Sequence, residues 1–257
     1  KISIIVTLSK YVSDCMDKEG KFRGLGYIIK TTMYCAVPTV LVMMQPDFGT
    51  AFVFICIMVF IYFIGRISWG YILTAAGGLA VCMPLAYYFV LSDSQRERID
   101  VFINPESDLQ NSGYNVAQSK IAIGSGQLTG KGFFSEGTLA QLRFVPERHT
   151  DFIFAGIVEG LGFVGGTIII CLFFALIFRW IYIAMRTKDS FGTCLVVGVA
   201  GMFTAHVFEN IGMTIGLMPV TGIPLPFISY GGSNLLTNLI GVGIVENVWM
   251  RRQSKKR

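Results

Sequence analysis

The stretch IFAGIVEGLGFVGGTIIICLFFALIF, residues 153–178, contains a single charged residue, Glu159. About 20 apolar residues in a helix cross the hydrocarbon core of a bilayer, so this run is long enough to span a membrane. The segment PERHTDFIF, residues 146–154, leads into it with four polar or ionisable side chains: Glu147, Arg148, His149 and Asp151. The sequence therefore places a carboxylate at the mouth of a hydrophobic helix.

The whole chain has the composition of an integral membrane protein. Its 257 residues are 53% hydrophobic and only 14% charged, with a mean hydropathy of +0.61, whereas about a quarter of the residues of a soluble domain are charged. The net charge of +5 is therefore interpreted as membrane topology and not as nucleic-acid binding. None of the six cysteines form a CxxC pair and the two histidines are far apart, so there is no zinc pattern.

Hydrophobic segments predict an all-α polytopic membrane protein with about seven transmembrane helices in a single membrane domain, 1–257. One large loop, about 92–150, interrupts otherwise tight connections. Because the chain starts with Lys1 inside the first segment, we expect earlier spans in a longer protein. The segments lie at about 1–13, 28–44, 49–65, 68–91, 152–180, 190–217 and 230–250.

Positive charges sort the connections into two sides. The loops MQPDFG (44–49) and LMPVTGIPLP (217–226) contain no Lys or Arg. The positive-inside rule therefore predicts that the basic side and the tail RRQSKKR (251–257) are cytoplasmic and that the loop 92–150 is extracytoplasmic. The basic side collects Lys10, Lys18, Lys21, Arg23, Lys30, Arg66, Arg179, Arg186 and Lys188.

We expect the large loop to be functional and not a flexible linker, because structureless loops of this length are otherwise uncommon. YNVAQSKIAI (114–123) spaces apolar residues as in a short amphipathic helix lying on the membrane face. The glycines that follow permit tight turns or close approach to a ligand; they are Gly124, Gly126, Gly130 and Gly132.

The pattern leaves two roles open for Asp151. It could act as a general base near neutral pH, or either Asp151 or Thr150 could form the N-cap of the following helix. In QPDFGT (45–50), a well-made turn with Asp47 capping the next helix is the favoured reading, although Gln45 and Asp47 face the same compartment as Asp151. Glu159 lies two turns beyond Asp151, and we expect it to pair with a partner side chain.

Two further stretches place polar groups or irregular backbone at membrane depth. The prolines and glycines of PVTGIPLPFISYGGSN (219–234) break helical geometry, which is tolerated where backbone lines a wet cavity or is buried in protein. His206, Glu209 and Asn210 share one helix face. Polar contacts between helices are the favoured reading there, and a proton relay is the alternative.

Four stretches together carry a family resemblance that covers most of the chain. They are QPDFGTA (45–51), GYNVAQSKIAIGSG (113–126), PERHTDFIFAGIVEGLGFVGG (146–166) and NIGMTIGLMPVTGIPLPFISYGGS (210–233). The chain resembles the SEDS proteins (shape, elongation, division and sporulation), the polytopic glycosyltransferases of the bacterial cell wall. KIAIGSGQLTGKG (120–132) and TGIPLPFISYGG (221–232) are more similar to RodA, the elongation member, than to FtsW, the division member.

The resemblance implies ten spans with both ends cytoplasmic, so three spans and a QPSE-type motif directly before Lys1 would precede this chain. We expect residues 1–257 alone to be inactive. The sequence departs from the family at Arg148, where Gln or Pro is common, and at Glu209, where an apolar residue is usual.

The resemblance also implies an activity, the inverting polymerisation of lipid II into glycan strands for elongation and rod shape, at the outer face of the bacterial cytoplasmic (inner) membrane. Asp151 occupies the position of the family's catalytic aspartate and is assigned as general base. The leaving pyrophosphate would be neutralised by basic residues or by a divalent cation, Mg or Mn. The candidate substrate-binding residues are Lys1, Gln45, Asp47, Arg98, Lys120, Arg143, Glu147, His149, Ser229 and Ser233.

Three alternatives remain open: a flippase or transporter of lipid II, a division or sporulation paralogue similar to FtsW, and a scaffold without enzymatic activity. Family members usually work with a class B penicillin-binding protein, the transpeptidase that cross-links the strands. No SxxK motif of a serine transpeptidase lies in a suitable outer context in this chain. A path across the membrane lined by polar residues in both halves would favour the flippase. The outer position of Asp151 instead favours chemistry on the outer face.

Overall fold

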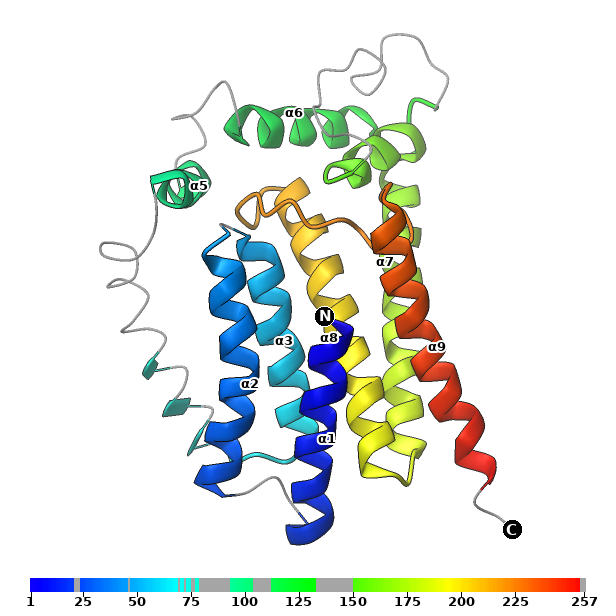
Figure 1. Ribbon diagram of the computed structural model, residues 1–257. Coiled ribbons are helices and arrows are strands. Elements are labelled where there is room, and N and C mark those ends of the chain that lie inside the picture. Colours follow the sequence, from blue (N-terminus) through cyan, green and yellow to red (C-terminus); the bar gives the residue numbers. More distant parts are fainter. Residues whose placement is uncertain are drawn as a thin grey trace. The chain divides into compact units, whose positions relative to one another are not determined.

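The computed structural model describes residues 1–20, 24–45, 47–68, 70–71, 73–74, 77–78, 93–103, 112–132 and 150–254, and the elements assigned there are all α-helices (Figure 1). Three of them are long and apolar enough to cross a membrane, Leu25–Met43, Ile153–Arg186 and Ser190–Thr214, and Phe48–Ile64 is a shorter apolar helix. The predicted all-α membrane fold is confirmed. The predicted segment 68–91 lies largely outside the described residues.

The helix bounds follow most hydrophobic segments within a few residues, but the helix that begins at Ile153 extends to Arg186, beyond the predicted end at residue 180. The first helix continues past residue 13, and the loop 92–150 holds two helices where one was expected, since α5 was not predicted. The helices are α1 (Ile2–Glu19), α2 (Leu25–Met43), α3 (Phe48–Ile64), α5 (Asp93–Ile103), α6 (Ser112–Ser125), α7 (Ile153–Arg186), α8 (Ser190–Thr214) and α9 (Gly232–Ser254).

The chain divides into two compact units, which are described separately. The first unit comprises Lys1–Asp93, Ile177–Ala205 and Leu239–Arg257; the second comprises Ser94–Leu176 and His206–Asn238. The prediction of a single membrane domain stays a prediction.

Close helix packing through small residues characterises the first unit, in which α1, α2 and α3 run side by side (Figure 1). A Cβ added to Gly198 would come within 2.8 Å of Ile5, and one added to Gly201 within 2.9 Å of Phe60. The Trp180 and Phe203 rings meet edge to face, with centroids 4.7 Å apart. Glycine thus lets the side chains of Ile5 and Phe60 pack directly against the backbone of α8.

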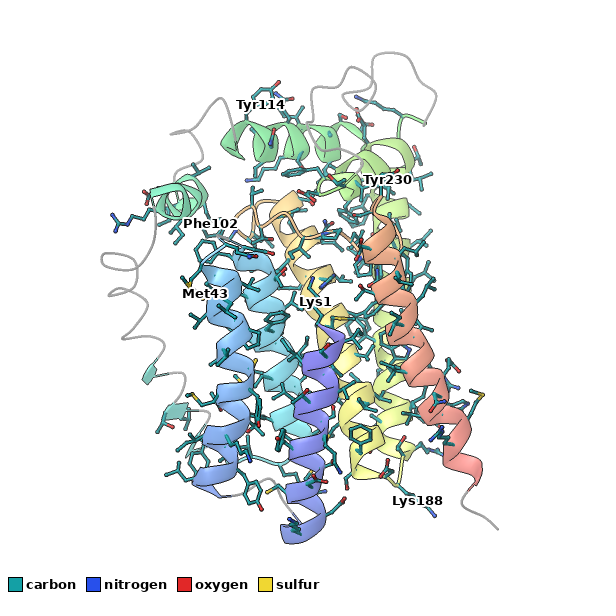
Figure 2. All side chains as sticks on the ribbon, in the orientation of Figure 1. Lys1, Met43, Phe102, Tyr114, Lys188 and Tyr230 are labelled. Atoms are coloured by element: carbon teal, nitrogen blue, oxygen red, sulfur yellow. The ribbon has the colours of Figure 1, made fainter. Side chains whose placement is uncertain are left out.

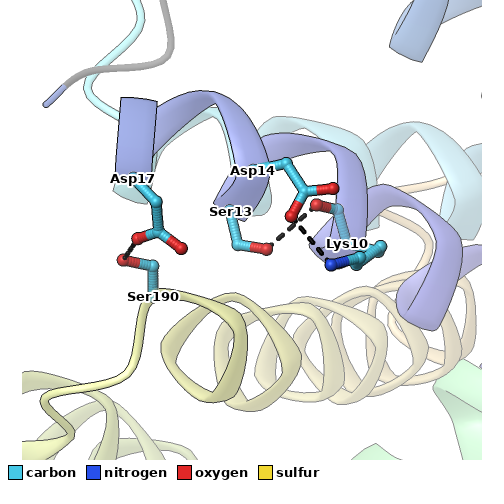
Figure 3. A network of polar contacts seen from close by, with 5 residues as sticks. All are labelled: Lys10, Ser13, Asp14, Asp17 and Ser190. Carbon is cyan, nitrogen blue, oxygen red and sulfur yellow. Dashed lines mark hydrogen bonds and ion pairs between the residues drawn. The ribbon is translucent and has the colours of Figure 1, made fainter. Parts of the chain in front are cut away.

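Polar contacts explain why α1 is longer than its apolar segment (Figure 3). Lys10 Nζ donates to Asp14 Oδ1 at 2.8 Å, one helical turn away, an arrangement that favours helix on an exposed face. Ser190 Oγ donates to Asp17 Oδ1 at 2.7 Å, which ties α1 to the start of α8. The helix then ends at Gly20, whose φ of 71° is the left-handed conformation common at helix C-termini.

Helix α7 is broken within the second unit, although its sequence reads as one apolar run. Gly162 has φ 73° and ψ −173°, so Phe163 N and Val164 N cannot reach the carbonyls of Glu159 and Gly160 in the usual helical pattern. Unpaired backbone groups are costly in apolar surroundings. The break therefore needs backbone partners from elsewhere in the chain.

The segment Gly126–Gly132, which follows α6, supplies all four of these partners. Lys131 N and Gly132 N donate to Glu159 O (2.9 Å) and Gly160 O (3.0 Å), while Phe163 N and Val164 N donate to Gln127 O (2.8 Å) and Leu128 O (3.2 Å). We call this arrangement the backbone splice. Its partners approach so closely that a Cβ on Gly130 would collide with Gly160 O. Of the four glycines predicted to allow close approach, Gly126 and Gly130 make it, to backbone of the same chain, whereas Gly124 faces open space.

Candidate functional site

The backbone of Asp151 is fixed by a buried amide from α8. Asp151 lies in a turn two residues before α7 begins at Ile153, and its side chain is partly exposed. Asn210 is fully buried, and its Nδ2 donates to Asp151 O and to Ile223 O, each at 2.8 Å. One side-chain amide therefore ties the entrance of α7 to the irregular segment after α8. The contact of Asn210 is polar, as predicted, but it joins α8 to irregular backbone and not to another helix.

A second side chain holds the residue before Asp151. Ser229 Oγ donates to Thr150 O at 2.6 Å and accepts from Leu225 N at 2.8 Å, and Ser229 is buried. Ser229 was predicted to bind substrate, but in this structure its proton already goes to a backbone carbonyl. Its geometry suits it to holding Thr150, and so the position of Asp151.

The segment 215–231 is irregular, which confirms the prediction for 219–231, whereas the last predicted residues, 232–234, already belong to α9. The Asp151 carboxylate lies against this segment. Gly222 has φ 72°, and a Cβ added there would come within 3.5 Å of Asp151 Oδ2. The adjacent Phe152 packs with Val116 of α6 and with Val220. An apolar contact thus fixes the turn from one side, while the carboxylate stays at a partly exposed edge.

Lys120 of α6 contacts the same segment. Ser119 Oγ donates to Thr214 O at 2.7 Å, which attaches α6 to the C-terminal end of α8. Lys120 lies over Gly216, because a Cβ on that glycine would collide with Lys120 Cε and Nζ. Its side chain is exposed. The structure therefore brings one predicted cation and the predicted base, Asp151, to a common stretch of backbone, Gly216–Gly222.

Four of the remaining predicted residues have no described side chain. Arg143, Glu147 and His149 lie outside the described residues, and of Arg98 only the backbone, on α5, is described. Ser233 is exposed in the first turn of α9.

Three predicted residues belong to the first unit: Lys1, Gln45 and Asp47. Asp47 Oδ1 accepts from Thr50 N at 3.0 Å at the start of α3, which confirms the helix-cap reading. Gln45 is exposed in the preceding turn, and Lys1 is partly buried at the start of α1.

Glu159 has the partner that its position predicted, although the sequence did not identify which residue this would be. Glu159 is 1% exposed, and its Oε1 lies 3.8 Å from Lys131 Nζ and 3.4 Å from Ser125 Oγ. The ion pair sits on the backbone splice, since Lys131 N also donates to Glu159 O. Sequence spacing gave no signal for Lys131, because its pairing depends on the break in α7.

These features define a helical membrane protein whose candidate site lies where the turn before α7 meets the irregular segment after α8. A family model described as cell cycle protein, FTSW_RODA_SPOVE, matches residues 1–254. The chain belongs to this family, and it is a bacterial membrane protein.

Several relatives match nearly the whole chain. It is 40% identical to peptidoglycan glycosyltransferase MrdB of Escherichia coli, over 98% of this chain and 67% of that protein. It is 38% identical to stage V sporulation protein E of Bacillus subtilis, over 96% and 66%. It is 40% identical to the probable peptidoglycan glycosyltransferase FtsW of Trichlorobacter lovleyi, over 81% and 54%. The chain thus spans about two thirds, or less, of the length of these relatives.

Solved structures share the fold. One, described as structural coordination of polymerization and crosslinking by a peptidoglycan synthase complex, matches with a TM-score of 0.77 and 27% identity, covering 97% of this chain and 68% of that one. The rod shape determining protein RodA of Thermus thermophilus matches with a TM-score of 0.65 and 25% identity, covering 98% and 64%.

Proposed function

We propose that this protein is a peptidoglycan glycosyltransferase that polymerises lipid II into glycan strands, with Asp151 as the general base. The observation that carries the proposal is the fixed position of Asp151, whose backbone is held by Asn210 and whose neighbour Thr150 is held by Ser229. The 40% identity to a relative named peptidoglycan glycosyltransferase supports the class of reaction. The similarity to RodA supports a role in elongation and rod shape.

In the proposed reaction, Asp151 accepts the proton of the 4-hydroxyl of the acceptor's N-acetylglucosamine. That oxygen attacks the anomeric carbon of the donor sugar in line and forms the β-1,4 bond, while the bond to the polyprenyl pyrophosphate breaks and the pyrophosphate carries away the electron pair. A positioned carboxylate of this kind contributes roughly 100- to 10,000-fold to the rate. Inversion of the α-linked donor requires only this one base and one displacement.

The leaving pyrophosphate requires positive charge, and Lys120 is the described residue that suits this role. Its ammonium group is exposed and lies over Gly216, on the same backbone stretch that the Asp151 carboxylate contacts at Gly222. A divalent cation, Mg or Mn, is compatible with this arrangement, since Mg²⁺ is commonly held by one or two carboxylates together with substrate phosphates. Within the described ranges, no three His, Cys, Asp or Glu residues form a metal-binding group.

The proposed setting is the bacterial cytoplasmic membrane, with the C-terminus in the cytoplasm and Asp151 on the outer side. The lack of Lys and Arg in 44–49 and 217–226 supports this orientation. The proposed partner is a class B penicillin-binding protein, by analogy with the peptidoglycan synthase complex to which the fold is similar.

The deciding experiment compares wild type with Asp151→Asn in the full-length protein, purified with its transpeptidase and supplied with fluorescent lipid II. Polymer on a gel should fall about 100-fold or more in the variant, with thermal unfolding unchanged. Asp14→Asn is the matched control, because Asp14 is an exposed carboxylate paired with Lys10 in the other unit, and it should polymerise as wild type does. Equal polymer from Asp151→Asn would reduce Asp151 to a structural residue. Movement of labelled lipid II across vesicles without polymer would favour the flippase.

A further inference from the structure

A row of alternating arginine and aromatic side chains joins α7 to α9 in the first unit. The guanidinium carbon of Arg186 lies 4.9 Å from the centre of the Tyr182 ring. That of Arg179 lies 5.5 Å from the same ring and 4.8 Å from the centre of the Trp249 ring. Such contacts are attractive, because each aromatic face is electron-rich. We call these four residues the arginine–aromatic row.

The row lies at the level where a membrane gives way to water. Counting from Phe163, the first residue after the break in α7, about 20 helical residues cross the hydrocarbon core, which ends the apolar span near Tyr182. Tyrosine and tryptophan favour this interface. Lys188, which follows α7 closely, lies at the same end of the first unit as the C-terminal end of α9 (Figure 2). The row therefore stands among lipid headgroups.

The guanidinium N–H groups of Arg179 and Arg186 take part in neither of the two ion pairs described below. The ion pairs found among the described residues join Lys10 to Asp14 and Lys131 to Glu159, so neither involves the row. The carboxylates nearest in sequence are Glu246, exposed on α9, and Asp189, whose Oδ2 accepts from Gly192 N at 3.0 Å. Stacking uses the face of a guanidinium group, and its N–H groups point outward in the plane, where they match the oxygens of a phosphate.

Apolar side chains flank this planar donor array. Phe178 and Met185 of α7 are 63% and 67% exposed, and Met250 of α9 is 65% exposed. A soluble phosphate would make no use of them, whereas acyl chains would cover them. We propose that the arginine–aromatic row binds the phosphate of an anionic phospholipid, with the acyl chains lying along Phe178, Met185 and Met250. This site is in the other unit from Asp151, and the inference does not rest on the proposed reaction.

Native mass spectrometry of the delipidated full-length protein, titrated with phosphatidylglycerol, measures the dissociation constant of the first bound lipid. Each surface arginine contributes about 1 kcal/mol toward anionic lipid, or about fivefold, so Arg179→Gln with Arg186→Gln should weaken binding about 30-fold. The pair Arg179→Lys and Arg186→Lys keeps the charge but loses the planar donors, and it should fall between wild type and the Gln pair. Phosphatidylcholine should bind wild type no better than it binds the Gln pair.

The matched control is Lys18→Gln with Lys30→Gln, which removes the same charge from exposed residues of α1 and α2, outside the row. It should change binding less than about twofold. An equal loss in this control would overturn the site in favour of diffuse attraction, and wild-type binding by the Lys pair would overturn the role of the planar donors. Displacement of the lipid by millimolar glycerol phosphate would mean that the row recognises a soluble phosphate ester instead. Thermal unfolding of each variant distinguishes lost binding from lost fold.

Discussion

The two units of the molecule use polar groups in different ways. In the first unit, hydroxyl groups of different helices meet one another: Tyr62 bonds with Thr31 and Thr32 at 2.8 and 2.9 Å, and Tyr11 with Tyr34 at 2.9 Å. In the second unit, buried side chains bond to backbone carbonyls outside their own helix or segment, as when Asn210 bonds to Asp151 and Ser229 to Thr150; the contacts of Glu159 with Ser125 and Lys131 are made between side chains. Regular helices satisfy their own backbone, whereas irregular backbone in apolar surroundings requires donors from outside.

This difference explains why the candidate site is found in the second unit. The turn before α7 and the irregular segment 215–231 bring a carboxylate and a backbone edge together, which the successive turns of one regular helix cannot do. The position of Asp151 then depends on two side chains, Asn210 and Ser229, which bond to the backbone at residues 151 and 150. We therefore expect substitutions at the ties of the second unit to have large effects and those at the polar groups of the first unit to have small ones.

The largest effect is expected when the backbone splice is opened. Gly130→Ala places a Cβ against Gly160 O and Gly162 N, in a residue whose φ is 81°. Backbone atoms cannot move aside as a flexible side chain can, so we expect a loss of about 3 kcal/mol or more in the free energy of unfolding. Thermal unfolding of the purified protein in detergent measures it as a lower transition temperature.

Gly124→Ala is the control for this change. Gly124 lies in α6, and a Cβ added there meets nothing within 4 Å. Replacing glycine by alanine inside a helix stabilises by about 0.5 to 1 kcal/mol, so this variant should unfold at or above the wild-type temperature. Equal transition temperatures for Gly130→Ala and wild type would show that the splice is not a tight contact in solution.

The next effect concerns the tie that holds Asp151. Asn210→Asp keeps the shape of the side chain but replaces its two donated hydrogen bonds by repulsion from the carbonyls of Asp151 and Ile223. An unsatisfied buried group costs about 1 to 3 kcal/mol. The resulting shift of Asp151 should also lower the polymerisation rate, and by more than the control variant Asn238→Asp lowers it. Lipid II polymerisation and thermal unfolding are measured on the same preparation.

Asn238→Asp is a suitable comparison, because Asn238 is also fully buried but donates to Asn234 Oδ1, on its own helix, at 3.3 Å. Both variants bury a charge, yet only Asn210→Asp breaks the link to the site. If the two lose stability and activity alike, Asn210 does not position Asp151.

The sequence predicted those features that depend on local patterns. The apolar segments located α2, α3, α7, α8 and α9, and the spacing in 114–123 located α6. The irregular segment after α8 followed from its prolines and glycines. Each of these depends on side-chain chemistry within a few turns of the chain.

Other features could not be predicted, because they depend on partners distant in sequence. The glycines of GLGFVGG (160–166) permit a break, but its place at Gly162 depends on the bonds with Gln127, Leu128, Lys131 and Gly132, which the run itself does not indicate. The same holds for Lys131 as the partner of Glu159 and for the bond from Ser229 to Thr150, residues 79 positions apart. The structure shows which groups Ser229 bonds to, and substrate binding by Ser229 stays a prediction.

The smallest effect is expected at Asp47 in the first unit, where two roles can be separated by one pair of variants. Asp47 accepts from Thr50 N at 3.0 Å, so Asp47→Ala should cost about 1 kcal/mol of stability through the lost cap. Asp47→Ser restores a capping oxygen but removes the carboxylate, and it should recover the wild-type transition temperature. If the serine variant also polymerises lipid II at the wild-type rate, Asp47 is a helix cap alone. A stable serine variant with a raised KM for lipid II would instead return Asp47 to the substrate-binding residues, and the first unit would then contribute more than structure to the reaction.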